Sequence, residues 1–164
     1  MAAVTEPLRT EHRALKARFN YLFQVADRAV DTGGTLAPAA AGDLHRFLTG
    51  WLLPHLRAED ELLYPVVDGI LGGTAATAAL RRQHAEISRL AIRLGELRRA
   101  CSAGPLTGWQ QHELRRTLYG LQAILTLHLA TEEEAYLSVL DEALSPEAAT
   151  ALFGRMNAMA VSVA

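Results

Sequence analysis

Two segments of the chain carry the same pair of potential metal-binding side chains. His55-Leu-Arg-Ala-Glu59 and His128-Leu-Ala-Thr-Glu132 both have the pattern His-x-x-x-Glu. Side chains four residues apart in an α-helix are neighbours on one face, with Cβ atoms about 5–6 Å apart, so each segment can direct an imidazole and a carboxylate toward one point. Nitrogen and oxygen donors offered together suit first-row transition metals. The spacing therefore predicts two halves of a metal site.

A lone histidine precedes each pair at nearly the same distance. His12 lies 43 residues before His55, and His84 lies 44 residues before His128. The fourteen residues that begin at each of the paired histidines are identical at six positions. We interpret this repeat as a helix hairpin used twice about a pseudo-two-fold axis, with donors from all four helices. The simplest arrangement has two metals, each bound by two histidines, that share both carboxylates as bridges.

The elements that position these side chains are predicted to be helices. Apolar residues recur every three or four positions, and strand signals are scarce. This pattern predicts an all-α fold, an antiparallel up-down four-helix bundle with a short C-terminal fifth helix, in which residues 1–164 form one domain with its core over 7–144. The expected helices cover roughly 7–30, 38–70, 74–101, 107–144 and 146–160.

Local signals mark several helix ends. Thr107 and Gln110 have the spacing of a capping box, and Ser145 is expected to be the N-cap of the last helix. Pro54 lies inside the second helix and predicts a bend immediately before His55. Glycine-containing segments are expected to end the helices at 31–34, 72–73 and 104–105.

The six donors interrupt rows of leucine that are predicted to face the core. A buried, ionised carboxylate costs several kcal/mol even after relaxation, so two carboxylates among four imidazoles need a partner that neutralises them. A metal centre does this and replaces hydrogen bonds with coordinate bonds. The rival interpretation is a fully satisfied polar network in the core. The other histidines, His45 and His112, lie at different angles on their helices and are expected to face solvent or to cap.

Composition limits the classes of partner and compartment. Half of the 164 residues are apolar and the formal net charge is −2, so nothing predicts binding to nucleic acid or to an anionic membrane. No apolar run approaches the roughly 18 residues of a membrane span. The N-terminal segment lacks the features of a signal peptide. Cys101 is the single cysteine; it is expected to be a helix-end residue without a special role, and it suits a cytoplasmic protein.

The ordered set of motifs resembles the hemerythrin family, in its HHE cation-binding branch. The resemblance covers His12, the segment from His55 to Pro65, His84 and the segment from His128 to Glu133, together with Leu53-Pro54. It implies a hemerythrin-like four-helix bundle with two non-haem iron ions, bridged by carboxylates and by an oxo or hydroxo group. The ligands it implies are His12, His55, Glu59, His84, His128 and Glu132.

The sequence departs from oxygen-carrying hemerythrins at two positions. Ser88 stands where those proteins have a second histidine one turn after the third-helix ligand, and Glu132 replaces an aspartate five residues after histidine. An open or water-filled position on one iron favours reaction over reversible carriage. Tyr64 or Tyr136 is a candidate for that position, although contact with a ligand or plain packing is the preferred interpretation of both.

Charged residues beside the motifs are expected to be mostly outward-facing. Each acidic neighbour is predicted to lie on the surface, although one of them could orient a histidine ring through its free N–H. These neighbours are Asp60, Glu61, Glu133 and Glu134. The arginine pairs are predicted to be solvated helix surface; they are Arg81-Arg82, Arg98-Arg99 and Arg115-Arg116.

Three functions fit this centre. The first is binding or sensing of oxygen, peroxide or nitric oxide, with an unknown protein partner possible. A di-iron peroxidase- or catalase-like enzyme ranks lower, because the sequence shows no organic-substrate pocket and no dedicated general base. Iron storage or homeostasis is the third, and a helical interaction module with an incidental metal site is the remaining alternative. Glu-x-x-His pairs and His-Glu-x-x-His are absent from the sequence, which disfavours ferritin-like proteins and zinc proteases.

Overall fold

The computed structural model describes residues 3–31, 36–100 and 106–161. Every regular element in these ranges is a helix, and none is a strand. The prediction of an all-helical fold is therefore confirmed. Cys101 and the helix ends predicted within 32–34 and 104–105 lie outside the described residues.

The helices fall into five runs along the chain. The first is α1, Glu6–Asp31, and the third is α5, Ala78–Ala100. The second run is continuous and consists of α2 (Leu36–Phe47), η1 (Leu48–Leu52), α3 (Leu53–Ala58), η2 (Glu59–Leu63) and α4 (Tyr64–Leu71). The fourth consists of α6 (Gly108–Thr131), η3 (Glu132–Tyr136) and α7 (Leu137–Ala143), and the last is α8, Pro146–Val161.

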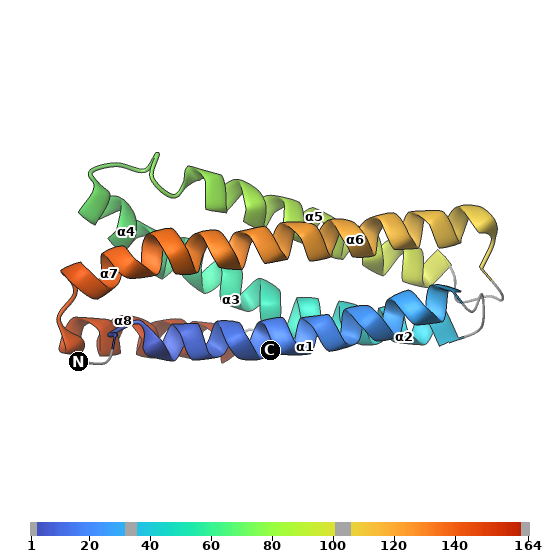
Figure 1. Cartoon of the computed structure of the whole chain (residues 1–164), viewed down its shortest axis with the longest axis horizontal. Helices are drawn as coiled ribbons and strands as arrows, with labels where there is room; N and C mark the ends of the chain where they lie inside the picture. The colour runs from blue at the N-terminus through green and yellow to red at the C-terminus, as the bar shows by residue number, and fades with distance from the viewer. Residues whose placement is uncertain (1–2, 32–35, 101–105, 162–164) are drawn as a thin grey trace.

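The long helices lie lengthwise beside one another (Figure 1). α1 packs against α2 and α6, while α5 packs against the same two helices from the other side. α8 lies at one end of the bundle, where it contacts α3 and η2. Among the described residues, no helix is both long and apolar enough to cross a membrane.

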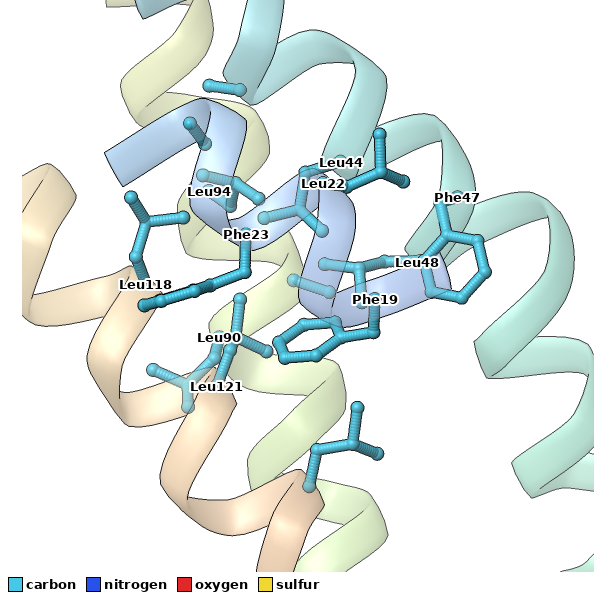
Figure 2. Packing of buried hydrophobic residues seen from close by; sticks show 14 of the residues in the cluster. Phe19, Leu22, Phe23, Leu44, Phe47, Leu48, Leu90, Leu94, Leu118 and Leu121 are labelled. Carbon is cyan, nitrogen blue, oxygen red and sulfur yellow. The ribbon is translucent and has the colours of Figure 1, made fainter. Parts of the chain in front are cut away.

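Two buried apolar clusters fill the bundle at different levels. Figure 2 shows part of the larger one, in which Phe19 and Phe23 of α1 meet leucines from α2, α5 and α6. The smaller cluster includes Leu8, Tyr64 and Leu137, and α8 contributes to it. The six predicted metal donors lie along the helices between the residues of these two clusters. Apolar packing on both sides therefore fixes a polar layer inside the bundle.

The predicted caps are present. The Thr107 side chain accepts from the Gln110 N–H, and the Gln110 side chain accepts from the Thr107 N–H, which completes a capping box. Ser145 Oγ accepts from the Ala148 N–H at 3.2 Å. These contacts satisfy N–H groups that a helix start leaves without partners.

Three π-helical segments interrupt the α-helices in the part of the chain that the structure describes. In η1 the Leu53 N–H bonds to Leu48 O, so the turn before Pro54 is wide. We attribute this to the proline ring, which clashes with a normal preceding turn and has no N–H to donate. The bend predicted at Pro54 thus takes the form of a wider turn. The other two segments, η2 and η3, begin at Glu59 and Glu132; the repeat contains both, and single π turns of this kind are frequent at functional sites.

Candidate metal centre

The six predicted donors meet in the polar layer, and the bundle buries all of them. His12, Glu59, His128 and Glu132 are 0 % exposed, and His55 and His84 are 3 % exposed. They come from α1, α3, η2, α5, α6 and η3 in chain order. The structure thus brings together side chains from every long helical run.

Glu59 lies at the centre of the group. Its Oε1 is 2.7 Å from His55 Nε2 and 3.4 Å from His12 Nε2. Its Oε2 is 3.3 Å from His84 Nε2 and 3.8 Å from His128 Nε2. Two sets of three donors result, His12–His55–Glu59 and Glu59–His84–His128, each with its donor atoms within 4.8 Å of one another.

Glu132 lies near one histidine from each set. Its Oε2 is 3.6 Å from His12 Nε2 and 3.7 Å from His128 Nε2. Glu132 belongs to neither three-donor set. Its position between the two sets nevertheless matches that of Glu59 in the other copy of the repeat.

Several of the inward-facing atoms have no hydrogen-bond partner in the part of the chain that the structure describes. They are His128 Nε2, Glu59 Oε2 and both carboxylate oxygens of Glu132. His55 Nε2 also lacks a hydrogen bond of good geometry, although it lies 2.7 Å from Glu59 Oε1. A buried polar atom without a partner costs about 1–3 kcal/mol. A fully satisfied polar network does not leave such atoms, so their presence disfavours that alternative. Nitrogen and oxygen lone pairs that converge in this way fit a transition-metal cation.

The outward nitrogen of each ring faces a polar side chain of another helix. His55 Nδ1 is hydrogen-bonded to Glu11 Oε1 at 3.1 Å. His128 Nδ1 is hydrogen-bonded to Gln83 Oε1 at 3.3 Å. Because Nδ1–H donates in both contacts, Nε2 is the nitrogen that faces the centre of the group and is available to a metal.

Acidic neighbours of the motifs face the Nδ1 atoms of the other two histidines. His84 Nδ1 is 3.1 Å from Asp60 Oδ1, and His12 Nδ1 is 3.4 Å from Glu133 Oε1, both within ion-pair distance although not in hydrogen-bond geometry. These two residues therefore fit the alternative expectation, that an acidic neighbour orients a histidine ring, although their side chains are still 35 % and 37 % exposed. The expectation of an outward charge holds for Glu61, whose side chain is 45 % exposed and pairs with an arginine.

The sequence interpretation missed the roles of Glu11 and Gln83. Each directly precedes a lone histidine, and the segments 5–12 and 77–84 share Thr, Leu, Arg and His at equivalent positions. Comparing these two segments would have extended the repeat backward from the His-x-x-x-Glu pairs and singled out both residues.

The same two segments hold matched networks at the helix starts. The Thr77 N–H and hydroxyl both donate to Asp68 Oδ1, at 3.1 and 2.9 Å. In the other copy, the Thr5 N–H donates to Asp141 Oδ1 at 2.9 Å, and the Thr5 hydroxyl donates to Asp141 Oδ2 at 3.0 Å. Each aspartate thus ties the start of one hairpin's first helix to a second helix of the bundle.

An arginine joins each of these networks. Arg81 donates to Asp60 O at 2.9 Å and to Asp68 Oδ2 at 3.4 Å, and its guanidinium lies 5.2 Å from the centroid of the Tyr64 ring. The expectation that Arg81 is merely solvated surface is therefore wrong. Its counterpart Arg9 binds the equivalent groups of the other copy.

A comparison with protein-family models now identifies the family. The model of the hemerythrin HHE cation-binding domain matches residues 3–140. The chain belongs to the hemerythrin HHE family. Searches of curated proteins and of solved structures found no match. The predicted resemblance is confirmed, and the clustered histidines and glutamates indicate a metal-binding protein of this family.

The two tyrosines considered for the hemerythrin-like centre have different surroundings. The Tyr64 hydroxyl lies 3.0 Å from His84 Nε2, and its ring stacks on the His84 ring. The Tyr136 hydroxyl instead donates to Ala76 O at 2.7 Å. Tyr64 therefore reaches the donor group and Tyr136 does not. Ser88, the position of the missing histidine, is half-buried.

Burial and mutual charge set the protonation of the cluster. Burial opposes ionisation of Glu59, but charge interaction with His55 and hydrogen bonds from the histidines outweigh it, so the pKa of Glu59 lies well below its usual range. Burial raises the pKa of Glu132 well above its usual range, and the nearby Glu59 charge adds to this. Two carboxylates that share a buried site cannot both ionise easily without a cation.

The pKa values of the histidines also shift in opposite directions. Burial lowers the pKa of His55, but Glu59 and Glu11 outweigh burial and raise that pKa well above its ordinary value. Burial lowers the pKa of His128 to about 4. Burial and the charge of Glu59 raise the pKa of Tyr64, which stays a neutral phenol. Burial lowers the pKa of His84 as well, but Asp60 and Glu59 outweigh burial and raise that pKa. Without metal, these shifts favour a proton on the His55 imidazole and on the Glu132 carboxyl.

The remaining histidines lie apart from the centre. His112 is exposed, as predicted. His45 is half-buried against Gly95 of α5, where a Cβ would collide with its ring, so its expected solvent-facing position is wrong. Burial and the charges of Arg98 and Arg99 lower the pKa of His45.

Proposed function

We propose that this chain binds two non-haem iron ions and uses them to bind or sense oxygen, peroxide or nitric oxide. His12 and His55 would hold one ion, His84 and His128 the other, and Glu59 and Glu132 would contribute to both. The observation that supports this most directly is the buried Glu59 carboxylate, which two sets of histidine nitrogens share. Iron itself is suggested by the family.

The proposal includes the finer architecture predicted from the sequence. The packing of α1 and α5 against α2 and α6 supports an antiparallel four-helix topology with a short helix added at its end. A single domain over residues 1–164 and a cytoplasmic location are further parts of the proposal.

The protein's own side chains would prepare the centre for a small ligand. A bound pair of irons would supply one-electron redox steps and exchangeable coordination positions. The outward Nδ1 contacts fix the tautomer and angle of the rings of His55 and His128. The apolar clusters on both sides exclude water, and Ser88 in place of a histidine leaves the His84 side with fewer protein donors, which suits an open position.

A di-iron redox enzyme is the second candidate, and Tyr64 is the observation that favours it. Its hydroxyl lies inside the donor group beside His84 Nε2 and retains its proton. A buried phenol in this place is a proton donor for chemistry on a peroxide. Turnover of peroxide would support this candidate over sensing.

Anaerobic loading with ferrous iron, followed by removal of free metal and metal analysis, tests the proposal. We expect two irons per chain and an absorption spectrum that changes on exposure to oxygen, peroxide or nitric oxide. Glu59→Gln should retain fewer than one iron because both sets lose their shared carboxylate. Glu61→Gln is the matched control, since Glu61 lies on the surface two residues away. Equal iron retention by Glu59→Gln and wild type would overturn the proposal, as would a preference for a single zinc ion.

A further inference from the structure

The two halves of the donor group differ in the charge behind one histidine. His55 Nδ1 donates to the carboxylate of Glu11 at 3.1 Å, and His128 Nδ1 donates to the amide oxygen of Gln83 at 3.3 Å. Glu11 and Gln83 occupy equivalent places in the repeat, because each directly precedes a lone histidine. Both copies of the repeat therefore have this hydrogen bond, but its acceptor is charged in one copy and neutral in the other.

The other outward contacts do not cancel this difference. Asp60 lies behind His84 and Glu133 behind His12, so each half has one carboxylate in that place. The half that contains His12 and His55 consequently has two anionic groups behind its imidazoles. The half that contains His84 and His128 has one anionic group and one neutral amide.

A second difference lies in the same half. Tyr64 and Leu137 occupy equivalent positions, five residues after Glu59 and Glu132. The Tyr64 hydroxyl contacts His84 Nε2, one of the inward-facing nitrogens. Leu137 offers no polar group in the other copy. Within the described residues, the half with His84 therefore has a neutral hydroxyl beside an inward-facing histidine nitrogen, and the equivalent position in the other half has none.

Hydrogen bonding behind a ligating histidine controls how strongly it binds metal. A carboxylate that accepts the Nδ1 proton draws electron density toward Nε2 and raises its basicity, and loss of such a partner commonly weakens metal binding by about 10–100-fold. Hydrogen bonds to a charged acceptor are roughly twice as strong as those to a neutral one. Glu11 should therefore strengthen His55 as a donor more than Gln83 strengthens His128.

We infer that the two metal positions are inequivalent: the position at His12 and His55, backed by Glu11, binds the first ion and holds it more tightly than the position at His84 and His128, backed by Gln83. The weaker position is then the one from which an ion is lost or exchanged first. This inference rests on the proposed function, since it requires two ions.

Exchanging the two acceptors is the direct test. Glu11 is 37 % exposed in its side chain, so Glu11→Gln does not open the core. Gln83→Glu introduces the carboxylate at the equivalent half-buried position. Wild type, each single variant and the double exchange are titrated with Co(II), which is redox-inert in this use and has absorption bands that report binding. Paramagnetic shifts of the His55 and His128 ring N–H signals show which half fills first.

In wild type we expect two binding steps separated by at least about 10-fold in affinity. The ring N–H signal of His55 should shift in the first step. Glu11→Gln should weaken the first step by about 10–100-fold, and Gln83→Glu should strengthen the second step by about the same factor. The double exchange should reverse the order in which the positions fill, so that the ring N–H signal of His128 shifts first. A reversed order would show that these acceptors set the relative affinity of the two positions, because general destabilisation weakens both binding steps alike.

Other outcomes separate failure of this inference from failure of the proposed function. Two equal steps in wild type, or a filling order that does not respond to the exchange, would overturn the inference and leave a two-metal protein intact. Absence of any binding by wild type would overturn the proposed function itself. If Glu11→Gln fails to fold, Gln83→Glu still tests the inference through the second step alone.

Discussion

Acidification should weaken metal binding, because protons occupy two of the atoms that a metal needs. The raised pKa of His55 keeps a proton on its imidazole, and the raised pKa of Glu132 keeps a proton on its carboxyl. Both protons must leave before these groups bind a cation, so metal and protons compete. Affinity therefore rises with pH wherever the metal-free groups still hold their protons, and it levels off above their raised pKa values.

The size of this effect follows from the number of protons. Each proton released makes the affinity change tenfold per pH unit, or about 1.4 kcal/mol. Two protons give about 100-fold per pH unit for loading of the complete centre, or about 2.7 kcal/mol. Glu59 remains ionised in this range because its pKa is depressed. His84, whose pKa Asp60 and Glu59 raise against the effect of burial, adds a further proton below that raised pKa, and His128 adds one only near its pKa of about 4.

Competition titrations of Co(II) against a coloured chelator, at several pH values, measure the slope. Glu132→Gln should reduce the slope by one proton, because the amide does not titrate in place of the acid. Glu134→Gln, an exposed neighbour, should leave the slope unchanged. The difference between wild type and Glu132→Gln is informative even if a bound water also releases a proton, since that proton is common to both. A pH-independent affinity, or equal slopes for wild type and Glu132→Gln, would refute the reasoning.

Three further predictions concern stability and Tyr64. Iron at 100 times its dissociation constant should stabilise wild type by about 2.7 kcal/mol in thermal unfolding but leave Glu59→Gln unaffected; equal melting of loaded and metal-free wild type would contradict this. Asp68→Ala should cost about 2–3 kcal/mol and Asp141→Ala about 1–2 kcal/mol, because each loses two hydrogen bonds from a threonine and Asp68 is the more buried. Burial opposes ionisation of Asp68, but its hydrogen bonds outweigh burial and lower its pKa. The contribution of Asp68 to the free energy of unfolding should therefore be present above about pH 4 and be lost as pH falls through the pKa of Asp68 in the folded protein. If Asp68→Ala and wild type lose stability equally on acidification, this reasoning is wrong. Tyr64→Phe should keep two irons and lower the free energy of unfolding of the metal-free protein by about 1 kcal/mol, because the contact with His84 is lost. If the iron-loaded wild type shows a visible phenolate-to-iron band that this variant removes, Tyr64 is a ligand and the prediction is wrong.

Which residue lies behind which histidine was beyond the reach of sequence reasoning. Glu11 contacts His55 across 44 positions of the chain, and Gln83 contacts His128 across 45. A helical period shows which residues share a face of one helix, but it gives no register between two helices. Side-chain packing sets that register, so these pairs became visible only when the helices were assembled.

Tyr64 and Tyr136 illustrate the same limit. Each follows a donor glutamate closely on its helix, at five and four residues, and both were plausible contacts of the metal. One residue of difference is about 100° around a helix, and the π turns that begin at Glu59 and Glu132 change that angle further. Packing then directed Tyr64 to His84 and Tyr136 to Ala76 O.

The sequence by itself determined the helical class, the family, the capping box at Thr107 and which six side chains interrupt the leucine rows. These are local properties, since propensity, capping and the spacing of His-x-x-x-Glu act within one helix. Only the tertiary structure decided how the donors share Glu59, what lies behind each ring and which carboxyl keeps a proton. Those features depend on distances between helices and on burial from solvent, and both quantities exist only in the assembled bundle.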